Sequence, residues 1–198
     1  VQAFNAEGID IYAVTPQNEP LNRGNSASLY MSWEEQRDFV KTALGPKFKT
    51  AGLATKIYAY DHNYDYSDIA TEKNYPGKMY EDAAASQYLA GAAYHNYGGN
   101  REELLNIHKA YPEKELLFTE TSIGTWNSGR DLSKRLLEDM KEVALGTINN
   151  WCRGVIVWNL MLDNDRAPNR EGGCQTCYGA VDISNSDYKT IIRNSHYY

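Results

Sequence analysis

Two glutamates follow short apolar segments that have the character of buried strands. Glu19 comes soon after residues 9–14, and Glu120 comes directly after residues 116–119. Cleaving a glycosidic bond requires two carboxyl groups, because one must protonate the leaving oxygen while the other attacks carbon or activates water. A single glutamate after a strand is usually a solvated loop residue. This chemistry therefore depends on whether both carboxyl groups reach one cleft.

Glu19 lies in the run Asn18-Glu19-Pro20, which is more specific than a lone glutamate. Pro20 restricts the backbone after Glu19. The side-chain amide of Asn18 can donate a hydrogen bond to a sugar hydroxyl beside the scissile bond. The run therefore predicts a carboxylate that is held in one direction next to a polar neighbour.

The segments that must position these carboxylates alternate between strand and helix. Residues 1–7 have the character of a helix tail that stops at Gly8, and Ser32 with Glu35 forms a capping box that opens the next helix. Near the end of the chain, the turn-forming residues 185–187 predict a hairpin between 180–184 and 190–193. The expected strands are 9–14, 56–60, 92–95, 116–119 and 154–158, and the expected helices after the first are 32–44, 82–89, 101–110 and 131–149.

This alternation predicts a parallel sheet covered by helices. Five strand–helix units are too few for a closed barrel, which usually needs about 250 residues. The alternatives are an open doubly wound sheet and part of a (β/α)8 barrel. The chain begins in a helix tail without Met, which favours the partial barrel. In such a barrel the carboxyl ends of all strands share one face, so Glu19 and Glu120 could project into the same cleft.

Further candidate residues lie near the ends of the expected strands. His95 and Tyr97 alternate along the chain, so both could face the cleft, although a buried structural pair is the competing interpretation. Trp158 could stack on the apolar face of a sugar or pack in the core. Trp126 lies in the loop after Glu120 and could form a wall of the pocket.

Three polar residues have weaker assignments. Asp61 could tune the ionisation of Glu120, orient a neighbour, or cap a turn. Asn169 and Arg170 lie in the loop after the last expected strand, where a leaving-group subsite could form.

Five segments of the sequence carry a family resemblance, and they are 12–20, 61–63, 92–97, 117–120 and 157–160. Together they resemble glycoside hydrolase family 30, which includes glucosylceramidases and microbial endo-β-1,6-glucanases. The resemblance implies that Glu19 is the general acid/base and Glu120 the nucleophile of a retaining mechanism. It also implies that residues 1–198 are one fragment of the catalytic (β/α)8 barrel, about strands 4 to 8, without the first three strands or a flanking β-sandwich domain. From the residue patterns and this resemblance together, the expected substrate-binding residues are Asn18, Asp61, His95, Tyr97, Trp126, Trp158 and Asn159.

The expected reaction is hydrolysis of a β-linked glucoside or β-glucan, with a β-1,6 linkage as one option. Segments 61–63 and 172–177 look more like the microbial enzymes than the animal glucosylceramidase, although a lipid glucoside remains an alternative substrate. A non-catalytic carbohydrate-binding protein is a rival that the 16 Tyr would suit. A nucleotide-binding sheet is disfavoured, because no Gly-rich loop joins a strand to a helix.

Composition and charge restrict the partners. The net charge is −6 and Lys and Arg form no run, so nucleic acid and anionic membranes are poor candidates. No apolar run approaches the roughly 18 residues of a membrane span. Neither a metal nor an organic cofactor is expected, since two carboxyl groups suffice for the reaction. The resemblance implies an extracellular, periplasmic or cell-surface location.

The cysteines leave the redox state open, and the half-barrel has a consequence for assembly. Cys152 stands alone, while Cys174 and Cys177 form either a small disulfide loop or a reduced pair. A half-barrel would also expose sheet edges and apolar surface, so self-association is expected.

Overall fold

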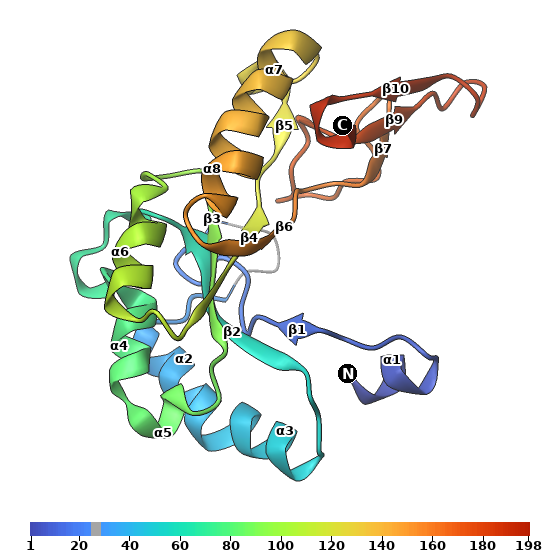
Figure 1. Ribbon diagram of the computed structural model, residues 1–198. Helices are drawn as coiled ribbons and strands as arrows, with labels where there is room; N and C mark the ends of the chain where they lie inside the picture. Colours follow the sequence, from blue (N-terminus) through green and yellow to red (C-terminus); the bar gives the residue numbers. More distant parts are fainter. Residues whose placement is uncertain (25–28) are drawn as a thin grey trace.

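The centre of the computed structural model, which describes residues 1–24 and 29–198, is a five-stranded parallel sheet (Figure 1). The spatial order of its strands is β1-β2-β3-β4-β6, which is the order in which they follow one another along the chain. A doubly wound sheet requires a point where the strand order reverses, and this order never reverses. The partial-barrel prediction is therefore confirmed. The strands are β1 (Ala13–Val14), β2 (Lys56–Asn63), β3 (Gly91–His95), β4 (Glu115–Glu120) and β6 (Cys152–Val155).

The helices between these strands include α2 to α6, which lie together on one side of the sheet (Figure 1). The predicted capping box is present, because the Ser32 side chain accepts from the Glu35 amide and the Glu35 side chain accepts from the Ser32 amide. Two long helices each contain one π-helical stretch, at 40–44 and 140–144. The helices are α1 (Gln2–Ala6), α2 (Trp33–Phe39), α3 (Gly45–Thr50), α4 (Tyr75–Glu81), α5 (Ala83–Ser86), α6 (Glu102–Ala110), α7 (Leu132–Asp139) and α8 (Leu145–Ile148).

Three predicted elements have bounds that differ clearly from the structure. The strand expected at 9–14 is shorter, because only Ala13–Val14 form β1. The helix expected at 82–89 lies mainly earlier, as α4, and Asp82 interrupts it in an extended conformation (ψ 99°) before the short α5. The Asp82 side chain caps α5 by accepting from the amides of Ala84 and Ala85. Strand β6 begins at Cys152 rather than at 154. Its pairing continues further, because the amides of Ile156 and Trp158 donate to carbonyls of the chain at and after β4.

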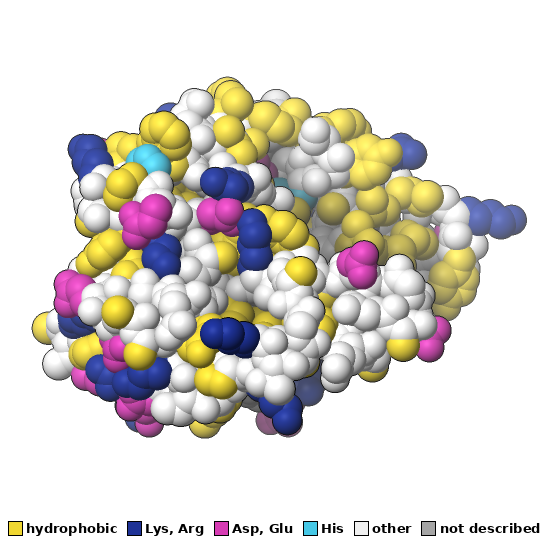
Figure 2. Space-filling view, turned by 60° about the horizontal axis from the view of Figure 1, so that its bottom comes forward, with side chains coloured by type: hydrophobic (Ala, Val, Ile, Leu, Met, Phe, Trp, Pro, Cys, Tyr) yellow, Lys and Arg dark blue, Asp and Glu magenta, His cyan; other side chains and the backbone are white. Residues whose placement is uncertain are grey.

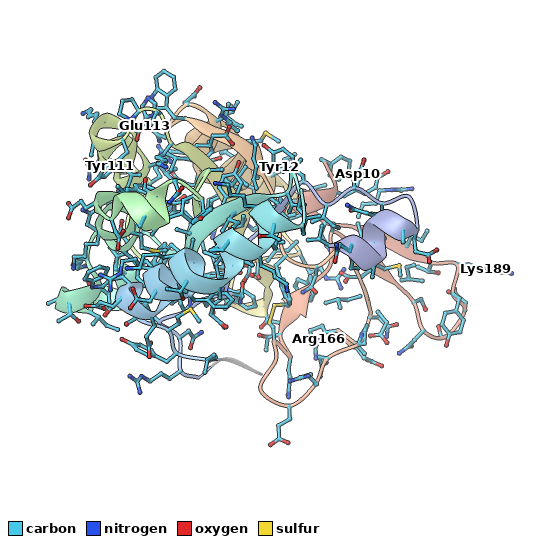
Figure 3. The ribbon with its side chains drawn as sticks, turned by 90° about the horizontal axis from the view of Figure 1, so that it is seen from below. Asp10, Tyr12, Tyr111, Glu113, Arg166 and Lys189 are labelled. Carbon is cyan, nitrogen blue, oxygen red and sulfur yellow. A yellow bond between two sulfur atoms is a disulfide. The ribbon has the colours of Figure 1, made fainter. Side chains whose placement is uncertain are left out.

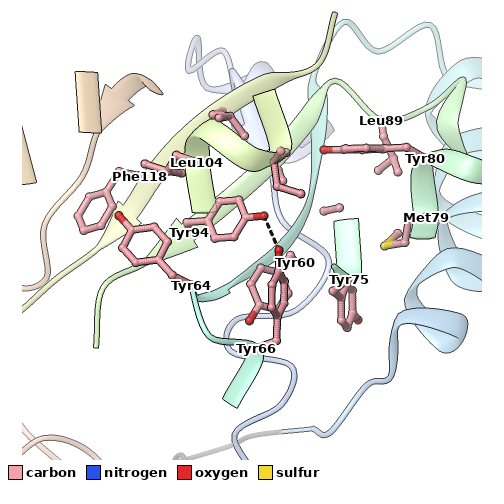
Figure 4. Close-up of a cluster of buried hydrophobic side chains, with 14 of the residues drawn as sticks. Tyr60, Tyr64, Tyr66, Tyr75, Met79, Tyr80, Leu89, Tyr94, Leu104 and Phe118 are labelled. Carbon is pink, nitrogen blue, oxygen red and sulfur yellow. Dashed lines mark hydrogen bonds between the residues drawn. The ribbon is translucent and has the colours of Figure 1, made fainter. Parts of the chain in front are cut away.

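The core between sheet and helices is built largely from tyrosines (Figure 4). Tyr60 and Tyr94 are fully buried, and their rings meet edge to face with centroids 5.4 Å apart. The hydroxyls of Tyr66 and Tyr94 lie 3.0 Å apart, and Tyr66 also donates to Glu103. Many of the tyrosines therefore serve the core, where their rings fill space and the Tyr66 and Tyr94 hydroxyls find polar partners.

The C-terminal region forms a second, smaller sheet with strands β7 (Met161–Asp163), β9 (Val181–Ile183) and β10 (Ile191–Arg193). Strands β9 and β10 pair antiparallel, which confirms the predicted hairpin, while β7 pairs parallel to β9. Lys189 lies at the hairpin turn, and Arg166 lies on the loop after β7 (Figure 3). Strand β5 (Ile123–Gly124) pairs separately with β8 (Cys177–Tyr178).

The space-filling view shows a hollow whose walls carry many hydrophobic side chains (Figure 2). Several large apolar side chains are solvent-exposed, among them Tyr12, Ile156, Leu160 and Met161. No helix within the described ranges is long and apolar enough to cross a membrane.

Candidate active site

Glu19 is held by backbone geometry that the sequence did not reveal. It adopts a left-handed conformation (φ 46°) directly before Pro20, where steric contact with the proline ring normally favours extended backbone. Its amide donates to the Asp61 carbonyl (2.9 Å), which anchors the loop after β1 to β2. The side-chain amide of Asn22 donates to Glu19 Oε2 (2.7 Å). The carboxylate is therefore buried and fixed in direction, as expected where backbone strain serves a site.

Glu120 is the last residue of β4, and strands β2 and β3 separate that strand from β1. All these strands are parallel, so their carboxyl ends lie at one edge of the sheet. A carboxylate oxygen of Glu19 and one of Glu120 lie within 4.8 Å of each other, and a ring nitrogen of His95 lies within the same distance of both. The two glutamates thus face one cleft.

A chain of buried hydrogen bonds links Glu19 through His95 to Asp61. His95 is fully buried, and its Nδ1 lies 3.3 Å from Glu19 Oε1 while its Nε2 lies 3.0 Å from Asp61 Oδ1. Thr15 and Thr119 each donate a hydroxyl to Asp61 at 2.6 Å. Asp61 thus contacts His95, and its negative charge also raises the pKa of Glu120. Its suggested roles of orienting a neighbour and of tuning Glu120 stay predictions. Its left-handed backbone (φ 73°) coincides with a register shift in the pairing of β2 with β3, the kind of irregularity common beside active sites.

The charges of His95, Glu19 and Glu120 shift one another's pKa values. Burial opposes the positive charge of His95, but its two carboxylate partners outweigh that cost and raise its pKa to about 9. Burial would raise the pKa of Glu19, yet hydrogen bonds from His95 and Asn22 leave it below the ordinary value. Burial raises the pKa of Glu120, and the nearby charge of Glu19 adds to that shift. Of the two carboxyl groups, Glu120 therefore binds a proton more readily than Glu19.

Glu120 lines a cavity of about 490 Å³. The Tyr97 hydroxyl donates to Glu120 Oε1 (3.0 Å) and lies 2.7 Å from the Ser122 hydroxyl. Trp126 and Trp158 line the same cavity with half of their surface exposed, so both present an aromatic face to an occupant. Asn18 and Arg170 are the other candidates of the sequence on this wall. The loop after β7 also contributes Gly173 and Cys174, and β8 contributes Cys177.

A disulfide between Cys174 and Cys177 closes this loop, which decides between the two states that the sequence left open. Cys152 is a buried free thiol. The Thr125 amide donates to the Thr176 carbonyl (3.0 Å), so the loop is also tied to the turn that carries Trp126.

The buried Asp61 and His95 do not line this cavity, and two further candidates of the sequence also lie apart from its wall. Asn159 has left-handed backbone (φ 68°), its carbonyl accepts from the Ala180 amide, and its side chain is not among those that line the cavity in the described chain. Asn169 donates to the Arg166 carbonyl within its own loop. Their suggested roles stay predictions, as do those of the residues that do line the cavity.

The sequence analysis missed Asn22 and Ser122, which contact Glu19 and Tyr97 respectively. Asn22 lies three residues after Glu19, but only the turn at Glu19 brings the two side chains together. Ser122 lies two residues after Glu120, a spacing that could have suggested it.

Glu19, His95 and Glu120 are close enough to be considered as metal ligands. However, both ring nitrogens of His95 already face carboxylates, and its raised pKa keeps the ring protonated near neutral pH. A protonated imidazole offers no lone pair to a metal. The arrangement suits proton transfer and nucleophilic attack instead.

Comparisons with known proteins agree with this geometry. An endo-1,6-β-D-glucanase of Trichoderma harzianum is 36% identical over 195 residues, which are 95% of this chain and 36% of that protein. The lysosomal acid glucosylceramidase of Mus musculus is 23% identical over 193 residues, covering 85% of this chain and 34% of that enzyme. A solved endo-β1,6-glucanase superposes with a TM-score of 0.99 at 89% identity, over 100% of this chain and 43% of that one.

The chain therefore spans between a third and a half of the length of these relatives. The model of the glycosyl hydrolase family 30 TIM-barrel domain matches residues 1–188 of the 198. Together with the parallel half-barrel and its paired glutamates, this match shows that the chain belongs to glycoside hydrolase family 30.

Proposed function

We propose that the protein containing this chain is a retaining endo-β-1,6-glucanase, with Glu120 as nucleophile and Glu19 as general acid/base. The observation that carries the proposal is the separation of at most 4.8 Å between oxygens of the two carboxylates. Retaining glycosidases hold their carboxyl groups about 5–5.5 Å apart, whereas inverting enzymes need roughly 6.5–9.5 Å to admit a water. The separation thus supports direct attack on the anomeric carbon.

In the first step, Glu120 would attack the anomeric carbon while Glu19 protonates the leaving oxygen, which gives a glycosyl-enzyme ester and a free sugar hydroxyl. In the second step, Glu19 would deprotonate a water that hydrolyses the ester. Tyr97 donates to Glu120 and would hold its carboxylate in line for attack. Trp126 and Trp158 would stack on the sugar.

The choice of β-1,6-glucan over a lipid glucoside rests on similarity. The relatives described as endo-1,6-β-glucanases are 36% and 89% identical to the chain, against 23% for the glucosylceramidase. The disulfide of Cys174 with Cys177 suits an oxidising compartment, so we place the enzyme outside the cytoplasm.

The pKa directions favour a second assignment in which the two roles are exchanged. The pKa of Glu120 is raised and that of Glu19 is lowered, although a general acid should hold the proton. For the first assignment to hold, substrate binding would have to raise the pKa of Glu19 above that of Glu120. The reversed assignment makes Glu19 the nucleophile.

Azide rescue distinguishes the two assignments in the full-length enzyme. Replacing Glu120 with Ala should abolish turnover of an aryl β-glucoside, and azide should restore it with an α-glycosyl azide as product. Replacing Glu19 with Ala should spare glycosylation by substrates with activated leaving groups, and azide should give the β-azide. The exposed Glu113, before β4 (Figure 3), provides the control variant Glu113→Ala.

Exchanged products would establish the reversed assignment. Rescue of neither variant, with equal losses on every substrate, would refute the two-carboxylate mechanism itself.

A further inference from the structure

A second cavity, of about 500 Å³, lies beside Glu19. Glu19 lines this cavity and Glu120 does not, whereas Glu120 lines the first cavity and Glu19 does not. Tyr97 lines both, so its side chain stands where the two spaces adjoin. The two carboxylates therefore face different compartments of one cleft.

The second cavity is lined by hydrogen-bonding groups set among apolar ones. Arg23 contributes an exposed guanidinium that stacks on Tyr30 at 4.0 Å from the ring centroid. The Asn63 side-chain oxygen accepts from the Tyr97 amide (3.0 Å), which leaves its NH2 group as a donor. Ser67 adds a hydroxyl and Ile69 an apolar face. Such a mixture of a few directional polar groups with apolar surface suits a neutral sugar ring.

His62 strengthens this interpretation. His62 lines the cavity, but its Nδ1 has almost no accessible surface and no hydrogen-bond partner within the described chain, so a ligand would contact other atoms of the ring. Burial lowers the pKa of His62 to about 4, so the ring is neutral and can donate or accept.

We propose that this cavity is the leaving-group subsite, which holds the sugar released when the glycosidic bond breaks. The inference rests on the proposed function. In that reaction the anomeric carbon must lie against Glu120, and the glycosidic oxygen must lie against Glu19, which protonates it. The sugar beyond that oxygen continues on the Glu19 side, and the space there is the cavity lined by Arg23, His62, Asn63, Ser67 and Ile69.

This assignment differs from the sequence-based suggestion that Asn169 and Arg170 bind the leaving group. Arg170 lines the cavity on the Glu120 side, so it would contact the sugar that becomes attached to the enzyme.

The test compares two substrates of the full-length enzyme that share a glycone. In β-1,6-glucotetraose the leaving group is a sugar, and in β-gentiobiosyl fluoride it is a single atom that cannot fill the subsite. In Arg23→Ala and in His62→Ala, the ratio of kcat/KM on the tetraose to kcat/KM on the fluoride should fall about three- to tenfold for each lost hydrogen bond. Turnover of the fluoride also shows that the variants are folded.

Arg193→Ala is the matched control, because Arg193 likewise stacks on a tyrosine ring, that of Tyr197, in the C-terminal sheet. It should keep the wild-type ratio. A second measurement adds gentiobiose as acceptor during fluoride turnover, since an acceptor occupies the same subsite. The fraction of glycosyl groups transferred to it should fall in both cavity variants.

An unchanged ratio and unchanged transfer in both variants would overturn the subsite and leave the proposed function standing. If the wild-type enzyme cleaved neither substrate, the proposed function and the subsite would fall together.

Discussion

His95 sets the electrostatic state of the cleft, because one fully buried imidazole faces two carboxylates. Its Nδ1 lies beside Glu19 and its Nε2 beside Asp61, whose oxygens also accept from Thr15 and Thr119. A charged group of this kind is stable inside a protein only when it is paired and hydrogen-bonded. The imidazolium therefore lowers the pKa of Glu19 and fixes its direction at the same time.

This arrangement predicts a specific dependence of stability on pH. The folded-state pKa of His95 is about 9, raised from 6.5, so its contribution is fully present below pH 6.5 and is lost as pH rises through 9. The shift corresponds to about 3 kcal/mol of unfolding free energy. Urea denaturation of the full-length enzyme between pH 6 and 9.5 should show this loss, and His95→Gln should remove that part of the slope.

His108→Gln is the matched control, because His108 lies on α6 and stacks on Trp151, away from both carboxylates. Identical slopes in wild type and His95→Gln would contradict a charged His95.

The hydroxyl of Tyr97 predicts a shift in the pH–rate profile. Its hydrogen bond lowers the pKa of Glu120, against burial, which raises it. Replacing Tyr97 with Phe should therefore raise that pKa by about 0.5–1 unit. If Glu120 is the nucleophile and must be ionised, the acid limb of the kcat/KM profile moves to higher pH.

Tyr188→Phe is the control, because Tyr188 is largely exposed in the C-terminal hairpin. Movement of the basic limb instead would favour Glu120 as the acid.

At the scale of elements, the site depends on where parallel strands end and where they are irregular. The pairing of β2 with β3 and of β3 with β4 each shifts register near the carboxyl end, at Tyr60/His62 and at Tyr94/His95. A shift by one residue changes which side chains face the cleft, because side chains alternate along a strand. These shifts accompany the approach of Asp61, His95 and Glu120 to a common region.

We expect the disulfide in the loop between β7 and β8 to affect both stability and substrate binding. Removing it with Cys174→Ser and Cys177→Ser together should lower the unfolding free energy by about 2 kcal/mol in the chain-entropy model, because the closed loop is short. Since Gly173 and Cys174 line the cavity with Glu120, KM for glucan should rise more than kcat falls. Reduction by dithiothreitol should reproduce the change in wild type and leave the double variant unaffected.

A rise in KM on reduction of the double variant would show that another group is responsible. An unchanged KM in the double variant would show that the loop keeps its position without the disulfide.

At the scale of the whole molecule, the sheet is open. Strands β1 and β6 form its two edges, and large apolar side chains such as Ile156 and Leu160 are exposed. Unpaired edges and apolar patches favour association between chains. The 198-residue chain expressed by itself should therefore form oligomers in light scattering, and Leu160→Lys should reduce them. It should also hydrolyse aryl β-glucosides poorly, so a monodisperse monomer with ordinary turnover would contradict this prediction.

The sequence by itself determined the order of elements and the two carboxylates. Alternating apolar strands and capped helices are local patterns, so the parallel sheet, the Ser32 capping box and the C-terminal hairpin could be predicted. The local pattern also places Glu19 and Glu120 after strands. Because parallel strands share one carboxyl edge, the approach of the two side chains could be predicted as well. The sequence pattern does not predict the helix at 75–81, because Asp82 is a typical helix-capping residue and indicates a helix start there, whereas it caps only the short α5.

Only the tertiary structure decided which side chains meet. Glu19, Asp61 and Tyr60 adopt left-handed backbone, with φ of 46°, 73° and 76°, and sequence patterns give no signal for such residues when they are not glycine. These conformations and the register shifts direct Glu19 toward both Asn22 and His95. The division of the cleft into a Glu120 side and a Glu19 side has the same origin, since a cavity depends on side-chain directions that are fixed by packing between distant segments.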